Sequence, residues 1–306
     1  MMDLAYVLRR TWRITWGHKT TWLFGLLIAV GSAGTRLVPA ARQLPFNLTQ
    51  KPAPLTTLTA GHLLIGLVVS LGIAALGALG RGGLVHQVHM AELHGSAPVG
   101  EAWVAAKGHW WPIWGLWLLF RLPLLLPIAV GTAPAWVALA RAVAPSEPET
   151  AVEAALAAFL LQFTCLAPAG CLSMILSTPL RVIQRLAIRA YVLEGLAIRP
   201  AVGRAWSVLK EHAGELALVW LITSSVGAAW LILLLLPLGV IQTAFGAAMA
   251  PLIFKSRWVE IILRVGVSGG LWLIGLAGGM PMETFTGTLW TLAYRELNQM
   301  GLTGEA

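Results

Sequence analysis

Residues 99–109 read VGEAWVAAKGH, and residues 202–212 read VGRAWSVLKEH. Six of the eleven positions are identical, and each copy stands just before a long apolar run. A weaker third copy lies near the start of the chain, where His18 follows Trp12 by the same six residues. Because internal repeats reveal the units from which a fold is assembled, these stretches predict a chain built from three similar units.

The composition is that of a membrane protein. Of the 306 residues, 58% are hydrophobic and only 11% are charged, and the mean hydropathy is +0.77. Soluble domains carry about 25% charged residues. The 15 Trp, 32 Gly and 17 Pro suit this class, because Trp favours the headgroup level and spanning helices tolerate Gly and Pro. We therefore expect an all-α polytopic membrane protein.

Apolar stretches long enough to cross a bilayer, about 20 residues each, recur along the chain. The six candidates lie at about 20–38, 61–80, 110–131, 154–178, 214–238 and 258–297. Gly278, Gly279 and Pro281 interrupt the last one, so it is either one broken span or a span followed by an interfacial helix. The prediction is one membrane domain, 1–306, with about six transmembrane helices in three hairpins. Its repeat units are expected at about 3–80, 81–178 and 180–298.

Lysine and arginine are unevenly divided between the two sides of these spans. Thirteen of the 21 fall on the side of both termini and six on the other, and Arg121 and Arg264 stay at membrane depth. Because cytoplasmic loops carry the excess of basic residues, we expect a multi-pass protein of the bacterial cytoplasmic (inner) membrane with both termini cytoplasmic. Arg9, Arg10 and Arg13 before an apolar run resemble a signal peptide. The third repeat copy predicts that this segment is retained.

The repeated stretch has the pattern of a short amphipathic helix. Val202, Ala205 and Trp206 share one helical face, and Lys210 and His212 lie toward its far end. Such a helix suits the cytoplasmic interface, with the Trp toward the acyl chains and the cations near the phosphates. We expect one interfacial helix before each hairpin. The interfacial residues of the three copies are Trp12 and His18; Trp103, Lys107 and His109; and Trp206, Lys210 and His212.

Two segments resemble a known group of proteins. Residues 191–220, YVLEGLAIRPAVGRAWSVLKEHAGELALVW, resemble the signature segment of uncharacterised bacterial six-span integral membrane proteins, and LWTLAYREL at 289–297 resembles their usual ending. That group is similar to the membrane domain attached to some glycerophosphodiester phosphodiesterases. The matching residues of the first segment are Glu194, Gly195, Ala201, Arg204, Ala205, Trp206 and Leu209. The resemblance implies a six-helix membrane fold and no activity, because the phosphodiesterase chemistry belongs to a separate soluble domain.

The sequence lacks the side-chain clusters that catalysis on lipids or phosphates needs. Asp3 is its single aspartate, and no two glutamates form a close pair at membrane depth, which argues against metal-dependent phosphoryl transfer. The best metal candidate is HQVHMAELH, where His86 and His89 share a face before Glu92 and His94. Histidines beside anionic lipid explain the same pattern. We therefore expect no metal, no cofactor and no enzymatic activity.

The basic residues form a stripe. The net charge is +8, which we assign to membrane orientation and to anionic lipid headgroups, with no nucleic-acid partner. Arg181, Arg185 and Arg189 recur every four residues, and Arg199 and Arg204 follow. The stripe is either a positive-inside anchor or a docking site for acidic headgroups or an acidic partner.

Two charges lie where a solute pathway would need them. Arg121, in mid-span four residues after Trp117, is either sheltered by that indole or lines a cavity. Glu283 lies beside the interruption in the last span. The leading interpretation is a non-enzymatic integral membrane protein that organises lipid or a complex with a membrane-protein partner. The alternative is a small-solute transporter or channel.

Overall fold

Helices account for nearly all of the described structure. The computed structural model describes residues 2–41, 55–143, 148–253 and 257–303, and no strand occurs within these ranges. The chain is 93% helical, which confirms the all-α class. The helices are α1 (Leu4–Gly17), α2 (Thr21–Ala41), α3 (Leu55–His94), α4 (Val99–Val143), α5 (Pro148–Glu194), α6 (Ile198–Glu211), α7 (Ala213–Ile253) and α8 (Arg257–Thr303).

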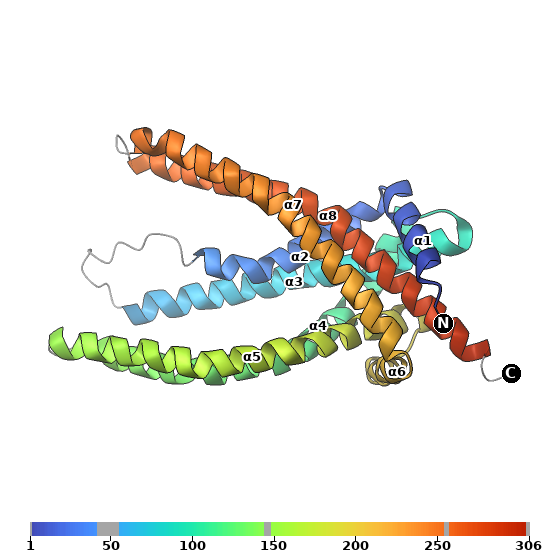
Figure 1. Cartoon of the computed structure of the whole chain (residues 1–306), viewed down its shortest axis with the longest axis horizontal. Helices are drawn as coiled ribbons and strands as arrows, with labels where there is room; N and C mark the ends of the chain where they lie inside the picture. The colour runs from blue at the N-terminus through green and yellow to red at the C-terminus, as the bar shows by residue number, and fades with distance from the viewer. Residues whose placement is uncertain (1, 42–54, 144–147, 254–256, 304–306) are drawn as a thin grey trace.

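The long helices lie side by side in pairs. α2 runs beside α3, α4 beside α5, and α7 beside α8 (Figure 1). The pairs approach one another at the end that carries α1, α6 and both chain termini, which we call the closed end, and they diverge toward the opposite end. The largest fully buried side chains include Trp290, Tyr294 and Phe24. Because α8 contacts α1, α2, α3, α5 and α7, it holds the core together.

Three helical segments in the described part of the chain are long and apolar enough to cross a membrane. They are Val68–His94, Cys171–Glu194 and Ala213–Leu234, and Thr21–Ser32 is a shorter apolar segment. The outward side chains of α7 are large and apolar, with Ile232, Leu233 and Leu236 each at least 60% exposed. An apolar surface of this kind suits lipid better than water.

The three copies of the repeated stretch share one pattern of burial. Thr11, Ala102 and Ala205 occupy equivalent positions, and each is fully buried. The tryptophan that follows is exposed in every copy: Trp12 at 61%, Trp103 at 36% and Trp206 at 50%. Each copy thus packs a small side chain into the bundle and leaves its indole at the surface.

The middle copy departs from the prediction of a separate interfacial helix. The first copy lies on α1 and the third on α6, and both helices end before the next one begins. Residues 99–109 instead form the first turns of α4, which continues without a break to Val143. The interfacial helix expected before the second hairpin is therefore wrong as a separate element.

The residue three positions after the motif histidine also differs between the copies. The Thr21 hydroxyl donates a hydrogen bond of 2.6 Å to the His18 carbonyl, and the Glu215 carboxylate lies 4.0 Å from His212 Nδ1. In the first and third copies a polar side chain at this position thus contacts the histidine at the helix boundary. The middle copy has Pro112 there, which offers no polar side chain.

Glycines mark the ends of α3 and α5. Gly95 and Gly195 each have a φ of 67°, in the left-handed region that favours glycine after a helix. α3 and α5 run up to these glycines. The breaks predicted near 81–98 and 180–200 are therefore confined to the few residues that follow them.

α8 is continuous through residues 278–281, so the predicted interruption of the last span is wrong. Pro281 lies inside the helix and removes one backbone N–H from it. Side chains bond to carbonyls nearby: Trp230 Nε1 donates to the Gly278 carbonyl at 2.8 Å, and Thr284 Oγ1 donates to the Met280 carbonyl at 2.9 Å. Partners of this kind let an apolar helix keep a proline.

Glycines let α2 lie against the backbones of its neighbours. A Cβ atom added at Gly31 would lie 2.4 Å from the Gly77 Cα of α3, and one added at Gly25 would lie 2.5 Å from the Met280 carbonyl oxygen of α8. Small residues permit such close helix packing inside membranes. α2 is thereby fixed between α3 and α8, where the three helices form one wall of a cavity.

Candidate anion-binding cavity

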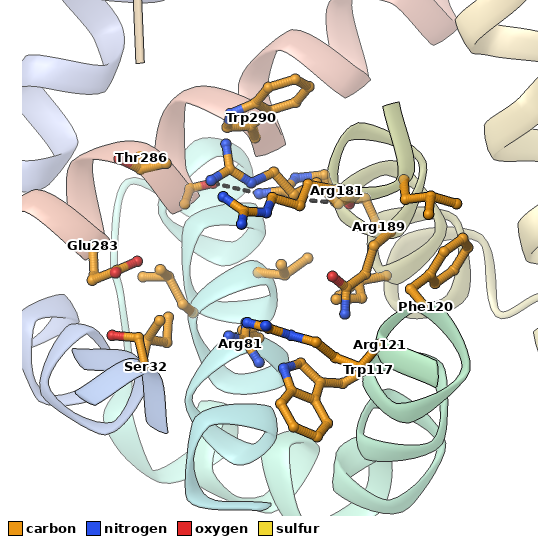
Figure 2. Close-up of a pocket in the computed structure, with 18 of the residues that line it drawn as sticks. Ser32, Arg81, Trp117, Phe120, Arg121, Arg181, Arg189, Glu283, Thr286 and Trp290 are labelled. Carbon is orange, nitrogen blue, oxygen red and sulfur yellow. Dashed lines mark hydrogen bonds between the residues drawn. The ribbon is translucent and has the colours of Figure 1, made fainter. Parts of the chain in front are cut away.

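A cavity of about 430 Å³ lies between α2, α3, α4, α5 and α8. Figure 2 shows Arg81, Arg121, Arg181 and Arg189 around this space. The arginines that line it are Arg81 of α3, Arg121 of α4, and Arg181, Arg185 and Arg189 of α5. Three different helices thus bring five guanidinium groups to one place, which we call the arginine cavity.

Two of these guanidinium groups lie over indole rings. The Cζ atom of Arg121 is 5.4 Å from the ring centroid of Trp117, and that of Arg185 is 5.2 Å from the ring centroid of Trp290. A cation–π contact places the cation over the face of the aromatic ring and stabilises its charge. The sequence offered two alternatives for Arg121, contact with Trp117 or a place in a cavity, and the structure shows both.

Arg189 is bound to the main chain and belongs to the cavity wall. Its Nη1 donates to the Arg185 carbonyl at 2.5 Å, and its Nη2 donates to the Gly287 carbonyl at 2.9 Å. The residue is only 5% exposed. Arg189 therefore joins α5 to α8 while its charge stays inside the bundle.

Glu283 of α8 is the only carboxylate among the lining residues. Five guanidinium groups against one carboxylate leave an excess of four positive charges. The ion pairs within the described residues lie elsewhere: Arg10 with Glu92, Arg204 with Glu194, and His212 with Glu215. Because charges interact strongly in a low-dielectric interior, such an excess attracts anions.

Three lining residues carry a buried N–H group without an acceptor. The atoms are Gln184 Nε2, Arg189 Nε and Trp290 Nε1. Buried donors normally have a partner, and an ion or water completes those that lack one in the protein. All three atoms lie below the accessible surface, so they belong to the walls of the cavity and are not open donors to a ligand inside it.

The cavity unites two features that the sequence presents as separate. Arg181, Arg185 and Arg189 come from the basic stripe, and Arg121 and Glu283 are the two predicted pathway residues. Their side chains meet because α4, α5 and α8 pack around the same space.

Sequence reasoning missed Arg81, Gln184 and Trp290. Arg81 was counted with the basic residues outside the spans, because the second span was expected to end at residue 80. The structure places it inside the apolar segment Val68–His94. A charge within such a segment is a functional candidate by default, so this signal was available. Gln184 and Trp290 carry no comparable signal.

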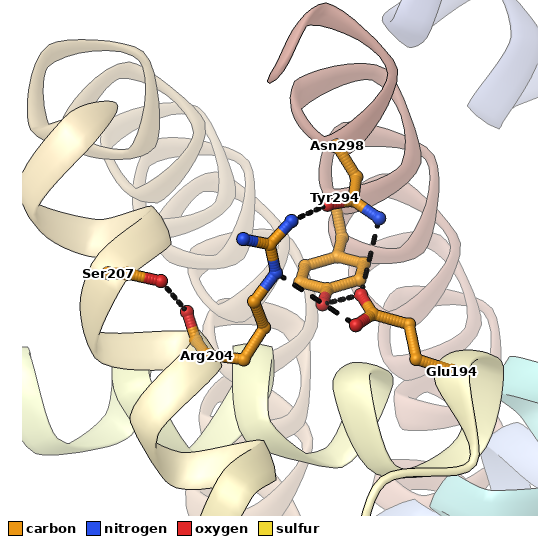
Figure 3. Close-up of polar contacts among 5 residues, drawn as sticks. All are labelled: Glu194, Arg204, Ser207, Tyr294 and Asn298. Atoms are coloured by element: carbon orange, nitrogen blue, oxygen red, sulfur yellow. Dashed lines mark hydrogen bonds and ion pairs between the residues drawn. The ribbon is translucent and has the colours of Figure 1, made fainter. Parts of the chain in front are cut away.

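Arg204 lies outside the arginine cavity, in a polar cluster at the closed end (Figure 3). It donates a hydrogen bond to Asn298 Oδ1, and its Nε lies 3.9 Å from Glu194 Oε2. The Tyr294 hydroxyl donates to Glu194 Oε1, which also accepts from Asn298 Nδ2 at 3.2 Å. The cluster fastens α6 to α5 and α8. Arg199 is exposed near the start of α6.

The lysines of the repeated motif lie over its tryptophans. Lys107 Nζ is 5.6 Å from the ring centroid of Trp103, and Lys210 Nζ is 5.9 Å from that of Trp206. All four side chains are exposed. The same cation–π pair therefore recurs at equivalent surface positions of α4 and α6, a contact that the sequence reasoning did not anticipate.

Two of the motif histidines end helices. The His18 N–H donates to the Ile14 carbonyl at 3.1 Å after α1, and the His212 N–H donates to the Val208 carbonyl at 3.0 Å after α6. Both backbones leave the helical conformation at the histidine. These two residues therefore mark the boundary between each short helix and the long one that follows.

His109 has a different environment, because α4 continues past it. Its Nδ1 lies 3.3 Å from the Tyr191 hydroxyl of α5, and the two rings meet edge to face. Burial, and then the nearby His86, lower the pKa of His109 below its ordinary value. The residue therefore favours its neutral form against α5.

The histidines of HQVHMAELH do not assemble a metal site. Among the described residues, no group of three or more His, Cys, Asp or Glu side chains could hold a metal ion, so His86, His89 and His94 are not brought together for one. Glu92 accepts a hydrogen bond of 2.9 Å from Arg10 Nε. This bond and the charge of Glu92 raise the pKa of Arg10 and tie α1 to α3.

Comparisons with known proteins identify no relative. No protein-family model, curated protein or solved structure matches the chain. The resemblance to six-span bacterial membrane proteins therefore stays a prediction.

Proposed function

We propose that the chain is a non-enzymatic integral membrane protein that binds and organises anionic lipid, with the headgroup phosphate in the arginine cavity. The observation that carries the proposal is the set of five cavity arginines opposed by Glu283 alone. Phosphate oxygens accept charge-assisted hydrogen bonds from several guanidinium groups at once. Buried charges of one sign are costly unless a counter-charge joins them. An anionic headgroup supplies that counter-charge.

In this proposal the three helix pairs cross the bacterial cytoplasmic membrane as six spans, with the closed end in the cytoplasm. The three apolar segments long enough to cross a membrane support the placement. The excess of basic residues on the side of both termini supports the orientation. The exposed Trp–Lys pairs of α4 and α6 suit the headgroup layer, where indoles and cations gather.

The arginine cavity lies at a depth that a headgroup can reach in this orientation. Arg189 and Arg181 precede the end of α5 at Glu194 by 5 and 13 residues. These separations correspond to about 8 and 20 Å along the helix. The headgroup layer lies outside a hydrocarbon core about 30 Å thick. In the proposed placement the end of α5 stands outside the hydrocarbon core, so that the arginines come to the level of the cytoplasmic headgroups and the adjoining acyl chains.

A second candidate function is the transport of a small anion. It is favoured by the presence of Arg121 and Glu283, the two predicted pathway residues, in the same cavity. Charged residues inside a membrane are typical of substrate and ion pathways. A transporter would use the arginine cavity as a temporary binding site.

Native mass spectrometry of the full chain in nanodiscs tests the proposal. The variant Arg121→Gln/Arg181→Gln removes two cavity charges from side chains that are not fully buried. Arg9→Gln/Arg13→Gln is the matched control, because it removes two exposed charges from α1. We expect phosphatidylglycerol to be retained over phosphatidylcholine by the wild type and by the control. We expect the cavity variant to lose about tenfold in this retention, since each removed charge-assisted bond weakens binding.

Two results would contradict the lipid-binding function. Equal retention of phosphatidylglycerol and phosphatidylcholine by the wild type would show that the protein does not select anionic lipid. Equal loss in the control variant would assign the retention to general surface charge. Phosphate flux into proteoliposomes, abolished in Arg121→Gln/Arg181→Gln alone, would favour the second candidate.

A further inference from the structure

We propose that the arginine cavity selects a terminal phosphate, which carries two negative charges and three free oxygens, over a singly charged phosphodiester. The inference rests on the proposed function and names the chemical class of its ligand. It depends on the charge balance of the cavity, on the free N–H donors and on the composition of the walls.

The charge balance favours a ligand with more than one charge. Five arginines and Glu283 leave four positive charges in excess within about 430 Å³. A phosphodiester neutralises one of them. A phosphate monoester carries about two charges at neutral pH, with a second pKa near 6. The second negative charge is attracted by the three positive charges that remain in excess.

The donors of the cavity favour a ligand with three free oxygens. Arg81, Arg121, Arg181 and Arg185 donate no side-chain hydrogen bond to other described residues, although all of them line the cavity. Two of the four lie over indoles, and each guanidinium group carries five N–H donors. Such a surplus is better matched by three terminal oxygens than by two.

The remaining walls provide room for a carbon group attached to the phosphate. Ile28, Leu84, Phe120 and Leu124 line the cavity together with the arginines. Pockets that bind organic ligands commonly have volumes of about 300–1,000 Å³, and this one lies in that range. The ligand class is therefore an organic phosphate monoester.

A terminal phosphate reaches the cavity either on a lipid or on a soluble molecule, and two arms of one experiment distinguish these sources. In the lipid arm, the full chain is placed in phosphatidylcholine nanodiscs that contain phosphatidic acid or phosphatidylglycerol. These lipids differ in having a phosphate monoester or a phosphodiester. In the soluble arm, the protein in detergent is titrated with glycerol 3-phosphate or glycerophosphoglycerol. These compounds are the same pair of headgroups without acyl chains.

We expect a preference of about tenfold or more for the monoester, because one additional charge-assisted interaction separates the two ligands. Arg121→Gln/Arg181→Gln should abolish this preference, whereas Arg9→Gln/Arg13→Gln should preserve it. A preference confined to the lipid arm identifies a headgroup site. A preference in both arms, with glycerol 3-phosphate displacing phosphatidic acid, identifies a site for soluble phosphates.

The outcomes that overturn the inference are separate from those that overturn the proposed function. Equal binding of phosphatidic acid and phosphatidylglycerol, both lost in the cavity variant, would overturn the selectivity and leave lipid binding intact. Retention of neither anionic lipid over phosphatidylcholine would overturn the proposed function. A monoester preference that survives in the cavity variant would show that the selective site lies elsewhere. Circular dichroism of each variant confirms that a lost preference is not lost folding.

Discussion

Arg189 of α5 donates a hydrogen bond of 2.9 Å to the carbonyl oxygen of Gly287 in α8. A positively charged side chain thereby joins two helices that lie far apart in the sequence. Arg121 and Arg185 instead lie over the indole rings of Trp117 and Trp290. The cavity therefore combines one arginine held by the main chain with others whose donors stay available.

The first prediction concerns Arg189 itself. Arg189→Lys keeps the charge but replaces the planar fork that bonds the Gly287 and Arg185 carbonyls. We expect the free energy of unfolding to decrease by about 1–3 kcal/mol, since buried carbonyls lose charge-assisted partners. Thermal unfolding in detergent measures this change. Arg9→Lys at the exposed surface of α1 is the control, and an equal effect of both substitutions would contradict a special role for the bond.

The second prediction concerns the contact between α2 and α3. A Cβ atom at Gly31 would lie 2.4 Å from the Gly77 Cα, so Gly31→Ala must push two backbones apart. We expect a loss of about 1–3 kcal/mol in stability. Gly203→Ala, in α6, is the matched control, because no atom of the surroundings lies within 4 Å of the methyl group that it adds. That control should be neutral or stabilising by up to about 1 kcal/mol. Tolerance of Gly31→Ala at wild-type stability would refute the close approach.

The third prediction concerns the polar cluster that fastens α6. Tyr294→Phe removes the hydroxyl that donates to Glu194 while the buried ring remains. Hydrogen bonds to charged groups contribute about 1.5–3 kcal/mol, so the unfolding temperature should decrease and cleavage before α6 should become faster. Limited proteolysis and thermal unfolding provide the two measurements. Tyr6→Phe, at a residue that is 50% exposed, should change neither.

The fourth prediction concerns the exposed tryptophans of the repeated motif. Trp103→Ala and Trp206→Ala remove indoles that lie under Lys107 and Lys210 at the surface. We expect weaker seating in the membrane, on the order of 1 kcal/mol for each indole, without loss of insertion, because the apolar helices supply the insertion free energy. Thermal stability compared between lipid and detergent measures the effect. Val104→Ala is the control, at a residue that is 71% exposed.

If both tryptophan variants keep the stability of the wild type in lipid as well as in detergent, the interfacial role of the motif is disproved. A loss in lipid alone supports it, because detergent does not reproduce the ordered headgroup layer.

The fifth prediction concerns pH. Burial, followed by the charge of His86, holds the pKa of His109 below its ordinary value of 6.5. The unfolded chain therefore binds more protons at this residue than the folded protein does. The resulting stabilisation is complete above pH 6.5 and is lost as the pH falls below it. We expect the unfolding temperature to decrease between about pH 6.5 and 5. His109→Gln should show a smaller decrease, and an identical slope would exclude His109 as the cause.

Local features of the fold were open to prediction because they depend on residues close together in the chain. The apolar segment Ala213–Leu234 follows from hydropathy alone. The short helix α6 follows from the amphipathic spacing of Val202, Ala205 and Trp206, although its buried face is formed by Ala201, Ala205 and Val208. The continuity of α4 and α8 did not follow, because Pro112 and Pro281 suggest breaks until the surrounding helices are known.

The sequence by itself determined the helical class, the apolar segments and the repeated motif, since helix periodicity and hydropathy are properties of short stretches of chain. Only the tertiary structure decided that Arg81, Arg121 and Glu283 share a cavity with the basic stripe of α5. These residues lie on separate helices, and their meeting depends on which helix faces pack together. That choice is made by contacts such as Gly31 against Gly77 and Arg189 against Gly287, which join positions distant in sequence and leave no periodic signal.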